Sequence, residues 1–137
     1  MQTADLRRRF ASRPAAHLAT VRPEGGPHVV PIVFALVDDT VYTAVDAKPK
    51  RTEHLQRLIN LRAEPRCAVL VDHYSVDWRQ LWWVRGDGRG SVLDPVPADH
   101  PGITALVQRF PQYRDEPPSG PLIVIVVDRW SGWTAVP

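Results

Sequence analysis

The sequence lacks the features that mark a membrane, secreted or disulfide-stabilised protein. Its one cysteine, Cys67, excludes an internal disulfide, and its longest apolar run, Leu122–Val127, has six residues where a spanning helix needs about 18. No apolar stretch follows the arginines of residues 7–9, so we expect no secretory signal. With 137 residues, 44% of them hydrophobic, the chain can close one core. We predict a single cytoplasmic domain over residues 1–137, with no membrane partner.

The net positive charge is also small, and lysine is nearly missing. The chain has 17 Lys and Arg against 15 Asp and Glu, and this net charge of +2 is too small for a nucleic-acid-binding surface. The only lysines, Lys48 and Lys50, stand beside Arg51 between a predicted strand and a predicted helix. Backbone N–H groups and the helix dipole favour an anion at such a junction. The cluster predicts a phosphate-binding site, with a solvated basic turn as the alternative.

The residue patterns of common catalytic sites are missing as well. The five histidines are scattered without metal-ligand spacing to one another or to Cys67, so we predict no metal site. There is no G-x-S-x-G motif, and the glycines at 86, 88 and 90 lie late in a strand pattern rather than before a helix. A serine hydrolase, a zinc enzyme and a dinucleotide-binding dehydrogenase are therefore disfavoured. Catalysis would need a bound cofactor, and the residues favour one with a phosphate and a flat ring.

The sequence does contain many short apolar segments, separated by 14 prolines. Their periodicity predicts six strands and two to three short helices, with a loop at 111–121. Mostly hairpin-connected strands indicate an α+β fold built on a closed or nearly closed antiparallel barrel. The strands are expected at 18–22, 29–37, 41–45, 67–72, 81–93 and 122–127, and the helices at 3–12, 51–62 and 98–110.

Some of these elements carry more detailed expectations. Pro31 interrupts the strand at 29–37, which indicates an edge position, a bulge or a kink. The strand at 67–72 alternates little and is expected to be buried on both faces. In the helix at 51–62, the residues that follow helical spacing are Leu55, Leu58, Ile59 and Arg62.

Tryptophan is unusually frequent, and all five tryptophans lie beyond residue 77. Trp82 and Trp83 are neighbours on one predicted strand, so they point to opposite faces and cannot both fill the barrel core. One of them must face a helix, a ligand or a partner subunit, and aromatic residues are enriched at interfaces. Residues 129–133 are expected to form a short aromatic tail after the last strand.

Short motifs follow one another along the chain: L-A-T-V (18–21), G-P-H-V-V-P-I-V-F (26–34), D-D-T-V-Y-T (38–43), K-P-K-R (48–51), E-P-R-C-A-V-L-V-D (64–72) and R-G-D-G-R-G (85–90). In order and spacing, they resemble the pyridoxamine 5′-phosphate oxidase-like flavoprotein family over nearly the whole chain. The K-P-K-R segment, the short length and the Arg-heavy composition are most similar to its actinobacterial branch, which uses the deazaflavin coenzyme F420.

This resemblance implies a six-stranded antiparallel split β-barrel that forms a homodimer, with two cofactor sites at the subunit interface. The ring of the cofactor would lie along the second and third strands, and its phosphate would be held after the third strand. The cofactor-binding residues implied are Pro31, Ile32, Val33 and Val45 along the ring, Lys48, Lys50 and Arg51 at the phosphate, and Trp78, Trp82 and Trp130 from the opposite subunit.

The activity implied is that of a coenzyme F420-dependent oxidoreductase, which passes a hydride between the reduced deazaflavin and an unidentified small-molecule acceptor. The A-K-P-K-R stretch lacks the Ser or Thr that FMN-using relatives usually place among the phosphate ligands. Its three cations suit a cofactor with a longer anionic tail. An FMN-binding oxidase or reductase of the same fold, and a non-catalytic flavin- or heme-binding protein, are the alternatives. No residue is assigned a catalytic role.

Overall fold

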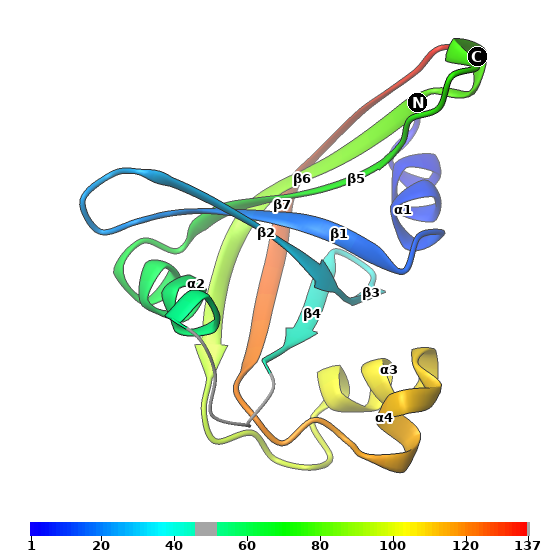
Figure 1. Ribbon diagram of the computed structural model, residues 1–137. Coiled ribbons are helices and arrows are strands. Elements are labelled where there is room, and N and C mark those ends of the chain that lie inside the picture. The colour runs from blue at the N-terminus through cyan, green and yellow to red at the C-terminus, as the bar shows by residue number, and fades with distance from the viewer. Residues whose placement is uncertain (46–51, 137) are drawn as a thin grey trace.

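A seven-stranded antiparallel sheet, which curls into a split barrel, forms the centre of the computed structural model (Figure 1). The model describes residues 1–45 and 52–136, without the side chains of residues 52–55. The order in the sheet is β2-β1-β5-β6-β7-β4-β3. The predicted α+β split barrel is confirmed, with seven strands instead of six. They are β1 (Ala15–Val21), β2 (Pro27–Val33), β3 (Ala35–Val37), β4 (Thr40–Ala44), β5 (Arg66–His73), β6 (Trp82–Leu93) and β7 (Leu122–Thr134).

Helices cover the ends of the sheet and leave much of its outer surface bare. Strands β5, β6 and β7 extend together toward a tip near both chain termini, away from α2, α3 and α4 (Figure 1). None of the helices in the described ranges is long and apolar enough to cross a membrane. The helices are α1 (Thr3–Ala11), α2 (Thr52–Ala63), α3 (Pro101–Arg109) and α4 (Pro111–Asp115), with a 3-10 turn η1 (Trp78–Gln80).

The additional strand arises because the segment predicted as one strand at 29–37 is broken at Phe34. Residues before the break pair with β1, whereas Ala35 pairs with Tyr42 of β4, on the opposite side of the sheet order. The Phe34 side chain is fully buried and packs against Phe10, with ring centroids 4.8 Å apart and the ring planes tilted by 55°. The chain therefore turns a corner at Phe34, and burial of this ring fixes the corner.

Two other expectations were wrong in extent. The segment 111–121 is not only a loop, because Pro111 occupies the first turn of α4, where its missing N–H has no helical partner to lose. Residues 129–133 are not a separate tail, because β7 continues through them and pairs with β6 up to Thr134 opposite Trp82. Because of this pairing, the backbone groups of residues 129–133 take part in the strand hydrogen bonds between β7 and β6.

The strand β5 was predicted to be buried on both faces, and this prediction was also wrong. Val69 and Val71 are buried in the barrel, while Leu70 between them is only partly covered. The described residues place no helix over the outer face of this strand. Its continuous apolar run therefore covers the core with one face and leaves apolar side chains on the other.

Candidate functional site

A pocket of about 340 Å³ opens between the two edges of the sheet. Its walls are residues 31–33 of β2, residues 43–45 at the end of β4, Arg57 of α2, and six residues between Gln112 and Ser119. This volume lies within the roughly 300–1,000 Å³ of small-molecule sites. Because the walls come from four distant segments, the pocket exists only when the sheet has curled and α4 has packed against it.

The position of the pocket follows from the split in the barrel. Strand β2 ends the sheet order on one side and the β3–β4 pair ends it on the other. Within the described residues β2 pairs only with β1, so its outer edge carries backbone groups that no other strand uses. Pro31 lies in this edge strand, the first of the three positions expected for it. A flat heterocycle with donors and acceptors on its rim can hydrogen-bond to such an edge.

All four residues that the sequence predicts along the cofactor ring line this pocket. Pro31, Ile32 and Val33 supply one wall, and Val45 supplies part of the facing wall. The two walls belong to strands that are not paired with each other. Their predicted contact with a cofactor stays a prediction.

The three predicted phosphate ligands, Lys48, Lys50 and Arg51, lie outside the described residues. The segment that holds them runs from Val45 to the start of α2 at Thr52. Val45 lines the pocket, and so does Arg57 on the second turn of α2. The basic segment is therefore connected at both ends to elements of the pocket.

Two pocket residues, Arg57 and Thr43, were missed by the sequence analysis. Arg57 is only 8% exposed, and burial lowers the pKa of its guanidinium from the usual value. Thr43 is 1% exposed, and its hydroxyl Oγ1 has no hydrogen-bond partner among the described residues. The pocket thus contains a buried cation and a buried hydroxyl.

The face that α2 buries explains why Arg57 was missed. The spacing of apolar residues had placed Ile59 on the same face as Leu58, but Ile59 is 46% exposed. The buried face consists of Arg57, Leu58, Asn60 and Leu61. The only signal in the sequence was the helical spacing, because Asn60 and Leu61 follow Arg57 by three and four residues and so share its face. Using this signal would have meant predicting that two polar residues are buried.

Of these two polar residues, Asn60 is hydrogen-bonded to a buried threonine of β1. Asn60 Nδ2 donates to Thr20 Oγ1 at 3.0 Å, and Gln56 Nε2 donates to Asn60 Oδ1 at 2.7 Å. His28 faces Thr20 in the strand register. Burial, followed by the charges of Arg22 and Arg57, lowers the pKa of His28 and favours its neutral form. A buried polar layer therefore leads from β1 to the pocket.

The family model for pyridoxamine 5′-phosphate oxidase matches residues 3–134. The chain belongs to this family. No protein in the curated set matches the sequence.

Solved structures of the same fold support the architecture. The conserved hypothetical protein Rv2991 from Mycobacterium tuberculosis has a TM-score of 0.77 at 22% identity, covering 98% of this chain and 86% of its own. A FAD-binding protein, mll6688, from Mesorhizobium loti has a TM-score of 0.71 at 22% identity, covering 96% and 92%. A heme-binding protein from Mycobacterium smegmatis has a TM-score of 0.69 at 17% identity, covering 96% and 57%. At these identities the likeness concerns the fold alone.

In this member of the family, none of the three predicted tryptophans lines the pocket of its own chain. Trp82 packs against the core, with the guanidinium carbons of Arg9 and Arg13 at 5.6 and 5.8 Å from its ring centroid. Trp83 points to the other face, as alternation predicts, and lines a hollow on the outer surface. The role predicted for Trp82 was to close the cofactor site of the opposite subunit, and it stays a prediction.

Trp130 is held by contacts within its own chain. Its indole N–H donates to Asp39 Oδ1 at 2.9 Å, and its ring meets Phe10 edge-on with centroids 5.1 Å apart. Asp39 also accepts from Arg7 Nε at 2.7 Å, which ties α1 to the β3–β4 turn. These hydrogen bonds hold the pKa of the Asp39 carboxyl below its usual value. Trp130 therefore has a structural role in the isolated chain.

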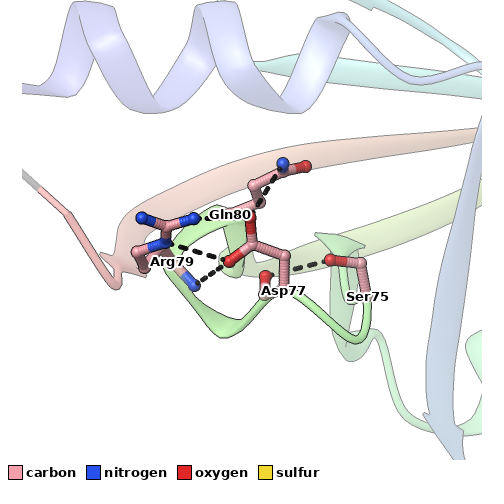
Figure 2. Close-up of polar contacts among 4 residues, drawn as sticks. All are labelled: Ser75, Asp77, Arg79 and Gln80. Atoms are coloured by element: carbon pink, nitrogen blue, oxygen red, sulfur yellow. Dashed lines mark hydrogen bonds and ion pairs between the residues drawn. The ribbon is translucent and has the colours of Figure 1, made fainter.

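Trp78 lies in the connection between β5 and β6, where Ser75, Asp77, Arg79 and Gln80 form the polar contacts drawn in Figure 2. The Asp77 carboxylate accepts from the backbone N–H of Arg79 at 3.1 Å and from Gln80 Nε2 at 3.2 Å. The hydroxyl of Ser75 donates to the Asp77 carbonyl at 3.0 Å. These bonds fix the tip while the Trp78 side chain stays 77% exposed. Exposed tryptophans are enriched at sites that contact another molecule.

The bare outer face of the sheet reaches from this tip region to the pocket. Strand register places Pro31 opposite His17, His17 opposite Leu70, and Leu70 opposite Arg85 in one row across four strands. Val33, beside Pro31 on the same face, is 42% exposed and also lines the pocket. The outer face and the pocket therefore share an edge.

Proposed function

We propose that the pocket binds a flavin-type cofactor with a phosphate group, and that the protein is a cytoplasmic coenzyme F420-dependent oxidoreductase. The observation that carries this proposal is the pocket at the barrel split, where apolar residues, a free strand edge and a buried guanidinium meet. Membership of the pyridoxamine 5′-phosphate oxidase family and the likeness to a FAD-binding protein support it.

The residues of the pocket fit such a cofactor. Pro31, Val33 and Val45 offer apolar surface for a flat ring, and the edge of β2 offers backbone donors and acceptors. Arg57 and the hydroxyl of Thr43 offer donors for an anionic or carbonyl oxygen. Lys48, Lys50 and Arg51 stand in the sequence between Val45 and Arg57, which both line the pocket, and their three charges would suit the longer anionic tail of F420 better than FMN.

The proposed role of this chain is to bind the cofactor and to orient it toward the acceptor. When bound, the deazaflavin would supply the hydride chemistry. The apolar walls would exclude water from one side of the ring, and the cationic residues would fix the anionic part, so that an acceptor stacked on the open side is correctly placed. Glu116 and Tyr113 line the α4 side of the pocket, and no acidic side chain among the described residues is buried there.

We also propose that the protein functions as a homodimer through the bare outer face of the sheet. Val29 is 61% exposed and Trp83 lines an outer hollow of about 390 Å³ with Leu70 and Tyr74. A second copy on this face would cover these side chains and would stand beside Pro31 and Val33 of the pocket. Light scattering should find a dimer of the 15.4 kDa chain, and a monomer at all concentrations would refute this part.

The deciding experiment is a cofactor titration of the purified protein with F420, FMN and heme, followed by tryptophan fluorescence and absorbance. We expect F420 binding in the micromolar range or tighter, roughly −8 kcal/mol. Lys50→Ala should weaken it, and no response to F420 would refute the assignment. Preferred binding of FMN or heme would support the two alternatives instead.

Turnover separates an enzyme from a cofactor carrier. Reduced F420 is supplied with quinones, enones or tetrapyrroles, and its reoxidation is compared with the rate without protein. Reoxidation above that rate supports an oxidoreductase. Tight binding without faster reoxidation across the acceptor set would favour a non-catalytic flavin-binding protein.

A further inference from the structure

We propose that one end of this molecule docks on an anionic lipid surface, with the connection between β5 and β6 inserted among the lipid headgroups. This connection, residues 74–81, is called the tip below. The cofactor pocket is walled by residues of α2 and α4, and these helices lie away from the tip (Figure 1). The inference is therefore independent of the proposed function, and docking would leave the pocket open to its ligands.

The tip carries apolar side chains that this chain does not cover. Val76 is fully exposed and Trp78 is 77% exposed. Single exposed apolar residues are common, but these two stand two positions apart in a turn that projects beyond the sheet (Figure 1). Neither of them lines the outer hollow that a second copy of the chain would cover. Tryptophan and aliphatic side chains on such a projection are residues that enter the interface of a bilayer.

Polar contacts within the tip satisfy its charged groups and leave the two apolar side chains outside (Figure 2). Arg79 Nε lies 3.2 Å from Asp77 Oδ1, and the backbone N–H of Gln80 donates to the Asp77 carbonyl at 3.0 Å. Asp77 is the only acidic residue of the tip, and its pairing with Arg79 neutralises it. No uncompensated carboxylate of the tip therefore opposes its approach to an anionic surface.

Two arginines at the base of the tip supply positive charge. His73 faces Trp82 in the last strand pair before the tip, and Arg13 donates to His73 Nδ1 at 2.7 Å. The guanidinium carbons of Arg9 and Arg13 lie 5.6 and 5.8 Å from the centroid of the Trp82 ring. Both side chains are only partly buried. Two cations therefore stand side by side where the tip leaves the sheet.

These two cations differ from the other arginines of α1 in having no counter-charge. Arg7 binds Asp39 at 2.7 Å. Arg8 binds Asp5. Among the described side chains, no carboxylate pairs with either of the two arginines at Trp82. Like charges around one indole repel each other, and phosphate oxygens of lipid headgroups would relieve this repulsion.

The expectation of no membrane partner came from the lack of an apolar run long enough to span a bilayer. Docking at the surface requires no spanning segment. It requires apolar side chains that reach the headgroup region and cations beside them, and the tip and its base provide both.

The test measures binding of the purified protein to vesicles by co-sedimentation at low ionic strength. We expect binding to vesicles made of equal parts of phosphatidylglycerol and phosphatidylcholine, weaker binding at high ionic strength, and little binding to pure phosphatidylcholine. Val76→Asp should weaken binding about ten-fold or more, because a carboxylate replaces the inserted apolar group. Val126→Asp, the same change at a 50% exposed residue on the part of β7 away from the tip, is the matched control and should bind like the wild type.

Two further variants locate the contact. Replacing Arg9 and Arg13 together by glutamine should weaken binding about 20-fold, whereas Arg62→Gln on the exposed side of α2 should have little effect. Tryptophan emission of the wild type should shift to the blue on the vesicles. Trp78→Phe should still bind but lose most of this shift, a readout that depends on where the indole lies.

No binding to the anionic vesicles would overturn the inference, and so would wild-type binding in both Val76→Asp and the double arginine variant. A dimer in light scattering without lipid that Val76→Asp dissociates would assign the tip to a second copy of the chain, which also overturns it. Cofactor titration is a separate measurement, so failure of docking leaves the proposed function standing.

Discussion

Two chemically identical substitutions should have different effects on the stability of this protein. Thr20 on β1 and Thr43 on β4 are both buried strand residues, 3% and 1% exposed. The hydroxyl of Thr20 accepts a hydrogen bond from Asn60 Nδ2, whereas that of Thr43 has no partner among the described residues. Valine has the shape of threonine and an equal or better preference for strands, so neither Thr→Val change leaves a cavity.

The expected change in unfolding free energy depends on whether the substitution leaves a buried group without its hydrogen-bond partner. Thr20→Val removes the only acceptor recorded for Asn60 Nδ2 in the described chain, and Asn60 is 0% exposed. A buried donor without a partner costs about 1–3 kcal/mol of unfolding free energy. Thr43→Val removes a hydroxyl that burial had already separated from water, and it should leave stability unchanged or raise it by about 1 kcal/mol. For a chain of this length, about 1 kcal/mol shifts the melting temperature by about 3–5 °C.

Urea and thermal unfolding of the apo-proteins give the comparison directly. Thr20→Ser is the control, because it keeps the hydroxyl that accepts from Asn60 and loses only a methyl group. We expect the order of stability to be Thr43→Val, then Thr20→Ser, then Thr20→Val. Equal losses for Thr20→Val and Thr43→Val, or a loss above about 1 kcal/mol for Thr43→Val, would refute the reasoning.

Three further predictions concern the rest of the fold. Because hydrogen bonds from Arg7 and Trp130 hold the pKa of Asp39 below its usual value, its contribution to stability is present above about pH 4 and is lost as the pH falls through the folded-state pKa. Asp39→Asn should flatten this acid-induced loss in urea unfolding measured between pH 2 and 7, and an unchanged slope would contradict it. Gly88→Ala should lower the unfolding free energy by about 3 kcal/mol or more, because a Cβ at this position would lie 2.1 Å from a backbone oxygen of β7. A melting temperature close to that of the wild type would argue against this steric explanation. Burial, with two nearby carboxylates, raises the pKa of Cys67 to about 12, so the folded protein should react with a thiol reagent at pH 8 far more slowly than the urea-unfolded chain.

The strands could be predicted from the sequence because their apolar residues and turns are local signals. The wall of Pro31, Ile32 and Val33 is one such segment, and Val45 follows another. That these two segments face each other depends on β4 pairing with β7, about 80 residues away. Periodicity within one segment carries no information about such a pairing. The prediction of these pocket residues therefore came from the family resemblance and not from the residue pattern.

The buried face of α2 could not be predicted because its polar residues contradict the hydrophobic pattern. Arg57 and Asn60 occupy buried positions of α2, while Ile59 between them is exposed. The acceptor that makes the burial of Asn60 possible is Thr20 of β1, which stands 40 residues earlier in the chain. The break at Phe34 was missed for the same reason, because the need for a corner arises from how the sheet closes.

The assembly of the pocket from distant segments has a consequence for folding kinetics. The β1–β2 and β3–β4 hairpins close short loops, whereas the β4–β7 pairing, with Val41 opposite Ile125, must close a loop of most of the chain. Such long-range contacts form slowly because chain entropy opposes them. The capacity to bind a ligand in this pocket should therefore appear with the last slow step of refolding, after most of the strand signal has recovered. A ligand added during refolding would then report when the barrel has closed.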